Sequence, residues 1–164
     1  MEFPQGGVGL TLGEALSTDW TSGVKVAFYD LLGDWSSISV VEHIADLGAD
    51  VIYLTPVAGY AWRITRYSKT AITARLREAG VEIRLLRAGL SFIGNEFAVE
   101  DLSTGKIECI TVDSVIAAGN PVARTDQYGR LAVSGIGVTL VGDCLAPRSA
   151  LEAVYEGHEV GRAL

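Results

Sequence analysis

Residues 24–56 read VKVAFYDLLGDWSSISVVEHIADLGADVIYLTP and predict a strand, a helix and a second strand. Apolar side chains run almost unbroken through VKVAFY and DVIYL, which is typical of strands buried on both faces. Between them, SISVVEHIADL repeats its apolar residues at helical spacing, and Gly48 supplies the left-handed residue that ends the helix. Because two strands joined by a helix are parallel, this stretch predicts a βαβ unit of an α/β fold.

The chain continues this pattern and then changes its period. A second helix is predicted near residues 69–79, a third strand at 81–86 and a further buried strand at 114–118. Between the last two, apolar residues alternate with a period of two, and Gly-Asn and Ser-Thr-Gly segments form tight turns. This alternation predicts an antiparallel three-stranded β-meander near residues 90–93, 96–101 and 106–112.

The closing segment reads VTLVGDCLAPRSALEAVYEGHEVGRAL and predicts a strand at 138–143, a turn and a helix at 149–164. Ser149 and Glu152 have the spacing of a capping box, which fixes where that helix begins. Since Asp143 ends the strand, we expect its carboxylate at the carboxyl edge of a sheet, where it could hold a cofactor hydroxyl. The alternative for Asp143 is a simple helix-cap or turn residue.

The composition describes an acidic chain that is able to form a core. It has 164 residues, 49% of them hydrophobic, and a net charge of -7, which argues against nucleic acid as a partner. No apolar run approaches the roughly 18 residues of a membrane span, so we expect no membrane partner and a cytoplasmic location. Cys109 and Cys144 alone cannot build a zinc site or an iron–sulfur cluster. We expect two reduced, partly buried thiols, with a disulfide as the alternative.

The turn after the first strand lacks the features of a dinucleotide site. A Rossmann-like site needs a glycine-rich turn whose backbone approaches the pyrophosphate. The turn DLLGDWSSI keeps one glycine, Gly33, where the fingerprint has three, and it adds Asp30, Asp34 and Trp35. Two carboxylates at the positive end of the helix oppose phosphate. We therefore expect a degenerate NAD(P)-type turn and do not expect NAD(P) to bind.

Taken in order, these segments resemble the C-terminal nucleotide-binding region of the NADH:flavin oxidoreductase family of trimethylamine dehydrogenase, histamine dehydrogenase and 2,4-dienoyl-CoA reductase. The resemblance covers about residues 8–164 and is most specific at GDCLAPR and EGHEVGRAL. In that family an FMN barrel with an iron–sulfur cluster precedes an FAD-type domain that carries an inserted NAD(P)-type domain. The Gly-rich residues 1–22 predict a linker with a short helix. The resemblance implies a Rossmann-like NAD(P)-type domain at 23–134 and a returning FAD-type segment at 135–164.

The resemblance also implies site residues in the closing segment. Gly142 and Asp143 match positions that approach the ribitol or pyrophosphate of FAD, or ADP, and Cys144, Ala146 and Pro147 belong to the same turn. This sequence contains no FMN barrel, cluster cysteines or first FAD half. FAD or ADP would therefore need a completing domain, and we expect no metal and no catalytic residue. The degenerate first turn is like that of the amine-dehydrogenase branch, whose NAD(P)-type domain has lost its pyridine nucleotide.

The sequence leaves three functions open. The first is a C-terminal domain or subunit of a flavin-dependent oxidoreductase of the amine dehydrogenase or dienoyl-CoA reductase type. Such a part would scaffold or dock a nucleotide, have little activity alone, and have the remainder of the enzyme, or a second copy, as its partner. The second is an autonomous NAD(P)H-dependent flavin reductase. The third is a protein-interaction module that docks through the closing strand and helix.

Overall fold

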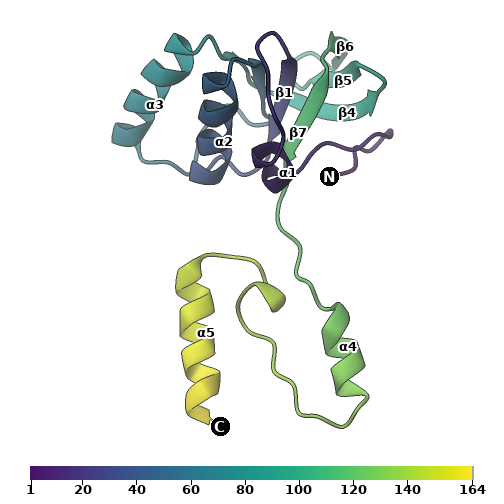
Figure 1. The fold of residues 1–164 in the computed structure, drawn as a ribbon, viewed down its shortest axis with the longest axis vertical. Helices are drawn as coiled ribbons and strands as arrows, with labels where there is room; N and C mark the ends of the chain where they lie inside the picture. The colour runs from purple at the N-terminus through teal and green to yellow at the C-terminus, as the bar shows by residue number, and fades with distance from the viewer. Residues whose placement is uncertain (164) are drawn as a thin grey trace. The chain divides into compact units, whose positions relative to one another are not determined.

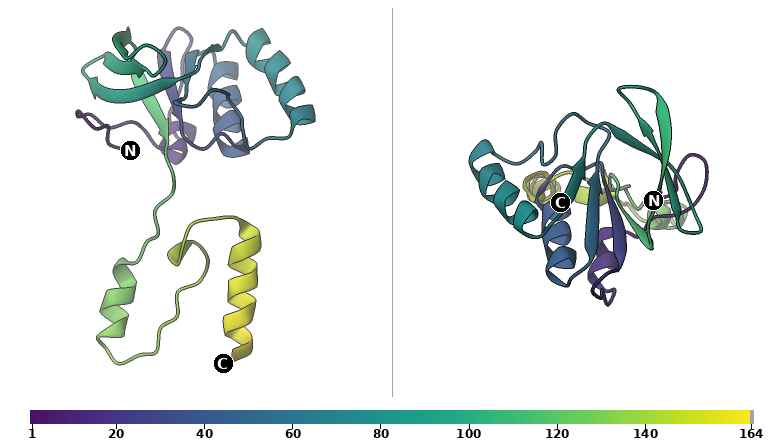
Figure 2. Two further views of the ribbon diagram at one scale, coloured as in Figure 1. Left: turned by 180° about the vertical axis from the view of Figure 1, so that it is seen from behind. Right: turned by 90° about the horizontal axis from the view of Figure 1, so that it is seen from above.

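The computed structural model describes residues 1–163, and Figures 1 and 2 draw its elements. The chain divides into two compact units, Met1–Gly119 and the residues from Asn120 onward. Leu164, which ends the predicted closing helix, lies outside the described residues. The boundary predicted near residue 134 stays a prediction.

A parallel sheet of four strands in the order β3-β2-β1-β7 forms the centre of the first unit. In β1, every residue after Lys25 is buried, as the apolar run predicted. Lys25 of β1 pairs with Asp50 of β2, and Val26 pairs with Ser114 of β7. The strands are β1 (Lys25–Asp30), β2 (Asp50–Leu54), β3 (Glu82–Arg84) and β7 (Ser114–Ala118).

Helices cover one face of this sheet (Figure 2). They are α1 (Leu12–Leu16), α2 (Trp35–Asp46) and α3 (Arg66–Glu78). The helices and the sheet share one hydrophobic cluster. Ile38 and Ile44 of α2 and Leu76 of α3 are fully buried in it, and they pack with Phe28 and Tyr53 from the strands. Helix α2 begins two residues before the predicted start because the side chain of Asp34 caps its first turn.

An antiparallel meander, ordered β4-β5-β6, packs on the opposite face of the sheet. Its core residues Phe97 and Val99 join Tyr29 and Leu54 of the sheet in a second cluster. Phe3 from the N-terminal segment closes this cluster, with its ring centroid 5.1 Å from that of Phe97. The strands are β4 (Arg87–Ile93), β5 (Glu96–Asp101) and β6 (Lys106–Thr111). The predicted Rossmann-like α/β fold with a three-stranded meander is therefore confirmed.

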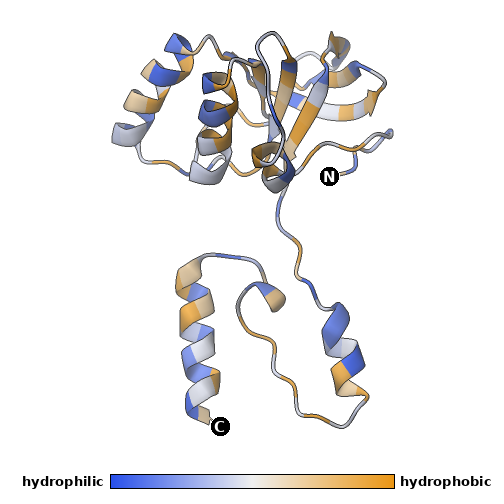
Figure 3. Cartoon of the chain, in the orientation of Figure 1, coloured by the Kyte–Doolittle hydropathy of each residue, from blue (hydrophilic) through white to orange (hydrophobic). Residues whose placement is uncertain are grey.

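The second unit contains α4 (Asp126–Ala132), the 3-10 turn η1 (Gly142–Cys144) and α5 (Ala150–Ala163). The strand predicted at 138–143 is wrong: the backbone before η1 joins no sheet. A strand of this kind needs a neighbour for its backbone hydrogen bonds, and the described part of this unit offers none. The predicted start of α5 is confirmed, because the Ser149 amide donates to the Glu152 carboxylate (3.0 Å). Hydrophobic and hydrophilic residues alternate along α5 (Figure 3).

Candidate functional site

Asp30 ends β1 with a fully buried carboxylate at the carboxyl edge of the parallel sheet. The backbone amides of Leu32 (2.8 Å) and Gly33 (3.0 Å) donate to it. So do the hydroxyls of Ser37 in α2 (2.7 Å) and Tyr53 in β2. Four donors from the turn, a helix and a second strand thus surround one buried acid. Such convergence compensates a carboxylate for its lost hydration, which would otherwise cost several kcal/mol.

The Tyr53 hydroxyl is held in its protonated, donating form. Burial raises the pKa of Tyr53 far above its usual value, and the negative charge of Asp30 raises it further. The Tyr53 ring is stacked with that of Phe28, with centroids 6.0 Å apart and planes 9° apart. Because the ring is fixed by packing, its hydroxyl is a preorganised donor to Asp30.

Asp34 occupies the N-terminus of α2 in the same turn. Its side chain accepts hydrogen bonds from the amides of Ser36 (3.0 Å) and Ser37 (3.3 Å). With the two amides bonded to Asp30, four backbone N–H groups of the turn and the first helical turn have carboxylate partners. These are the kind of groups that a dinucleotide-binding turn presents to pyrophosphate.

The loop that follows β2 covers the predicted NAD(P)-type glycine. Gly33 is buried with φ of +63°, and a Cβ placed on it would lie 2.2 Å from the indole of Trp62. The amide of Arg63 also donates to the Gly33 carbonyl (2.9 Å). The loop is fixed to α3, since the Lys69 ammonium lies 4.3 Å from the centre of the Tyr60 ring. Sequence spacing gave no signal that Trp62 would cover Gly33.

The predicted residues of the closing segment lie together in one turn. The amides of Leu145 (2.9 Å) and Ala146 (3.0 Å) both donate to the Gly142 carbonyl, which winds the segment around η1. Gly142 is buried, Ala146 and Pro147 are half-buried, and Asp143 and Cys144 are exposed. Both cysteines are free, as predicted, but Cys109 and Cys144 are exposed rather than partly buried. Cys109 is exposed because it lies on β6, the outer strand of the meander.

Glu156, which the sequence reasoning missed, ties this turn to α5. The Gly142 amide donates to the Glu156 carboxylate (2.7 Å), and the Arg148 guanidinium binds the other carboxylate oxygen. Gly142 has φ of +58°, and a Cβ on it would lie 3.1 Å from the Cβ of Ala153. The turn therefore requires glycine at 142 and approaches α5 closely.

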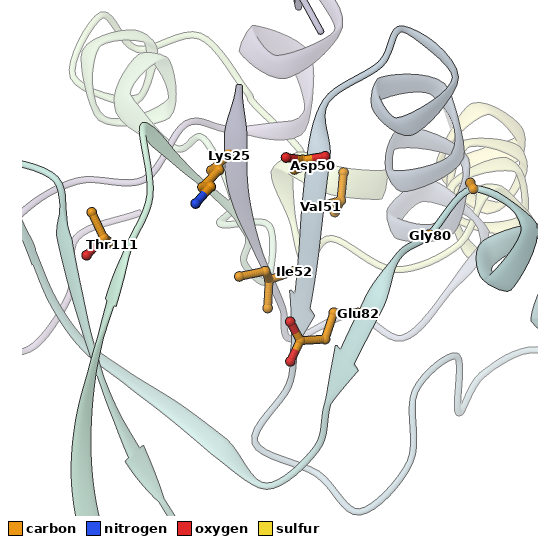
Figure 4. A pocket seen from close by; sticks show the side chains of 8 residues that line it. Lys25, Asp50, Val51, Ile52, Gly80, Glu82 and Thr111 are labelled. Carbon is orange, nitrogen blue, oxygen red and sulfur yellow. The ribbon is translucent and has the colours of Figure 1, made fainter. Parts of the chain in front are cut away.

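A hollow of about 340 Å³ lies at the amino ends of the parallel strands (Figure 4). Lys25, Asp50 and Glu82, which begin β1, β2 and β3, line it. Its lining thus carries one positive and two negative side chains. Among residues 1–163, no group of three or more His, Cys, Asp or Glu side chains is placed to hold a metal ion. No helix in this range is long and apolar enough to cross a membrane.

Neither a protein-family model nor a curated protein sequence matches the chain. Solved structures do match it. Histamine dehydrogenase from Rhizobium sp. 4-9 superposes with a TM-score of 0.82 and 27% identity, over 96% of this chain and 26% of its own. The chain matches the C-terminal region of a flavin oxidoreductase. The family resemblance predicted from the sequence is therefore confirmed.

Two further structures support the match. The 6-hydroxypseudooxynicotine amine oxidase from Pseudomonas geniculata N1 has a TM-score of 0.83 and 24% identity, over 93% of this chain and 24% of its own. The flavoprotein disulfide reductase RclA from Escherichia coli has a TM-score of 0.67 and 18% identity, over 100% of this chain and 41% of its own. These two likenesses concern the fold. The chain spans about a quarter of the length of the amine-oxidising enzymes that it matches.

Proposed function

We propose that this chain is the C-terminal nucleotide-binding-type part of a flavin-dependent oxidoreductase of the amine dehydrogenase or dienoyl-CoA reductase type. In this proposal, residues 23–134 form the NAD(P)-type domain and residues 135–164 return to complete an FAD-type domain. The chain scaffolds that domain and docks its nucleotide, and it has little activity alone. The remainder of the oxidoreductase is the partner.

One observation carries the proposal: the second unit has no hydrophobic core of its own. No hydrophobic side chain is buried between Asn120 and Ala163. Val133, Leu151 and Val154 are 87%, 75% and 71% exposed. A helix as short as α5 is marginal in water without tertiary packing. Its apolar side chains are therefore suited to packing against a domain that another part of the oxidoreductase supplies.

The turn at Gly142 suits a nucleotide hydroxyl better than a phosphate. The Gly142 amide already donates to Glu156, so it is not free to receive a phosphate oxygen. The exposed Asp143 carboxylate accepts hydrogen bonds, which fits a ribitol or ribose hydroxyl and repels a phosphate. In the completed domain, Asp143 would hold such a hydroxyl of FAD or ADP, with Cys144, Ala146 and Pro147 beside it. Bound FAD would supply electron transfer.

Calorimetric titration of the 164-residue chain with FAD, ADP, NADH and NADPH tests this proposal. We expect a colourless protein and weak or no binding, because the completing half of the site belongs to another domain. A tight, stoichiometric NADPH signal would contradict the proposal. A yellow protein that Asp143→Ala bleaches, while the control Asp126→Ala does not, would favour the autonomous flavin reductase.

Co-purification with the parent oxidoreductase tests the partner. The chain should associate with the FMN barrel and first FAD-type half of the enzyme when the two are produced together. Leu151→Glu and Val154→Glu in the exposed face of α5 should weaken that association by about tenfold or more, whereas Glu159→Lys in the same helix should not. A chain that stays a clean monomer beside the rest of the enzyme would refute the assignment.

A further inference from the structure

The first unit contains a cluster of hydrogen-bond donors that is occupied by the carboxylate of Asp30, a residue of the same chain. The donors around Asp30 come from the turn (Leu32 and Gly33), from α2 (Ser37) and from β2 (Tyr53). All of them point at one carboxylate that solvent does not reach. Such a set of groups suits an oxyanion, because two amides and two hydroxyls can donate four hydrogen atoms to its oxygens.

We propose that Asp30 is a built-in anion that permanently occupies an internal oxyanion site of the Rossmann-like unit. When the Asp30 side chain is removed, the free site takes a small carboxylate such as formate or acetate. In the intact protein, Asp30 holds the β1–α2 turn in the conformation that a bound phosphate group stabilises in nucleotide-binding members of this fold. The unit therefore folds without a nucleotide at this turn. This inference is independent of the nucleotide proposed for the Gly142 turn.

Two neighbours close the site from outside. The Trp62 indole packs on Gly33 so tightly that the glycine has no room for a Cβ. Asp34 takes the amides of Ser36 and Ser37 at the start of α2. A pyrophosphate would have to displace the indole and compete with two carboxylates for the same amides. The turn is consequently closed to pyridine nucleotides by packing and by charge.

Chemical rescue tests the proposal. Asp30→Gly removes the carboxylate and leaves space for formate or acetate, and equilibrium unfolding in urea avoids any question of access to the closed site. In sodium chloride we expect the urea midpoint of Asp30→Gly to fall by about 1 M or more, since four buried donors lose their acceptor. Formate at the same ionic strength should restore a saturable part of this loss, and it should leave the wild type at its chloride value.

Two control variants make the comparison specific. Asp113 accepts the Lys25 amide (2.9 Å) at an exposed position, so Asp113→Gly should respond equally to formate and chloride. Asp30→Asn keeps the volume of the side chain, so it should be destabilised and insensitive to formate. If glycine in the strand prevents folding in both salts, Asp30→Ala provides the same comparison.

Three results would overturn the proposal. They are an Asp30→Gly variant as stable as the wild type, equal effects of formate and chloride on both the Gly and the Ala variant, and saturable stabilisation of the wild type by inorganic pyrophosphate. The first would mean that the donors do not need an anion. The second would mean that the emptied site does not bind one, and the third that the turn is open to phosphates.

Discussion

The indole of Trp62 and the α-carbon of Gly33 are packed against each other without room for a methyl group. A Cβ built on Gly33 would lie 2.2 Å from Cδ2 and 2.4 Å from Cε2 and Cε3 of the ring. Two independent features therefore require glycine at position 33: the φ of +63° and this contact with the indole. The one glycine that remains from the nucleotide fingerprint thus packs directly against an aromatic ring.

We predict that Gly33→Ala is severely destabilising. The left-handed backbone alone should cost about 1 kcal/mol, and the clash with Trp62 should bring the total to about 3 kcal/mol or more. Urea denaturation measures the free energy of unfolding. Gly80→Ala is the matched control, because Gly80 has φ of +73° with nothing within 4 Å of the added Cβ, so it carries only the backbone cost.

A second variant separates the two costs at Gly33. In a Trp62→Ala background, Gly33→Ala should cost no more than Gly80→Ala, because the ring that it meets is gone. If the penalty at Gly33 persists without the indole, the contact with Trp62 does not cause it.

The buried hydroxyl of Tyr53 gives another prediction. Tyr53→Phe keeps the ring stack with Phe28 but removes one donor from the Asp30 carboxylate. We expect a loss of about 2 kcal/mol in the free energy of unfolding, since hydrogen bonds to charged groups contribute about 1.5–3 kcal/mol. Tyr60→Phe, which removes a half-buried hydrogen bond to the neutral Thr73 hydroxyl, should cost less. Equal losses in the two variants would mean that the bond from Tyr53 to Asp30 is no stronger than the one between Tyr60 and Thr73.

The same hydroxyl predicts how stability depends on alkaline pH. In the unfolded chain Tyr53 releases its proton near pH 10, whereas burial and Asp30 keep its pKa well above that value in the folded state. Above about pH 10 the folded state therefore binds more protons than the unfolded chain. The contribution of the Tyr53 hydroxyl to the free energy of unfolding is fully present at lower pH and is lost as the pH rises. Tyr53→Phe should reduce this fall by up to about 1.4 kcal/mol per pH unit.

Another tyrosine also contributes to the alkaline loss of stability. Burial also raises the pKa of Tyr29, so the Phe variant should keep part of the alkaline loss of stability. Urea unfolding at several pH values between 8 and about 11.5 distinguishes the contributions. An unchanged slope in Tyr53→Phe would mean that the Tyr53 hydroxyl titrates normally in the folded protein.

Sequence reasoning succeeded where structure depends on neighbouring residues in the chain. The apolar run VKVAFY, which ends at Tyr29, predicted β1. Gly94 and Gly105 marked the turns of the meander, and they have φ of +61° and +70° in the structure. Ser149 and Glu152 predicted the start of α5 from a contact between residues three apart. In each case the physical cause lies within a few residues of the signal.

It failed where the cause lies elsewhere in the fold. The pattern VTLVGD has the composition of a strand, but a strand also needs a neighbour, and this unit offers none among its described residues. The donation of Tyr53 to Asp30 joins residues 23 positions apart, and the cover of Trp62 on Gly33 depends on the path of a loop. Glu156 accepts a hydrogen bond from Gly142, which lies 14 positions away, so no local sequence motif predicts this contact.

The contact between Glu156 and Gly142 leads to the last prediction. Glu156→Ala removes the acceptor of the Gly142 amide and the partner of Arg148, so the turn loses its attachment to α5. We expect amide hydrogen exchange at Gly142 to accelerate by about tenfold or more, because one charge-assisted hydrogen bond is worth about 1.5–3 kcal/mol. Glu159→Ala, one turn later in α5, removes only an exposed bond from Tyr155 and should leave the Gly142 amide unchanged. Acceleration in both variants would mean that α5 as a whole, and not the Glu156 carboxylate, holds the turn.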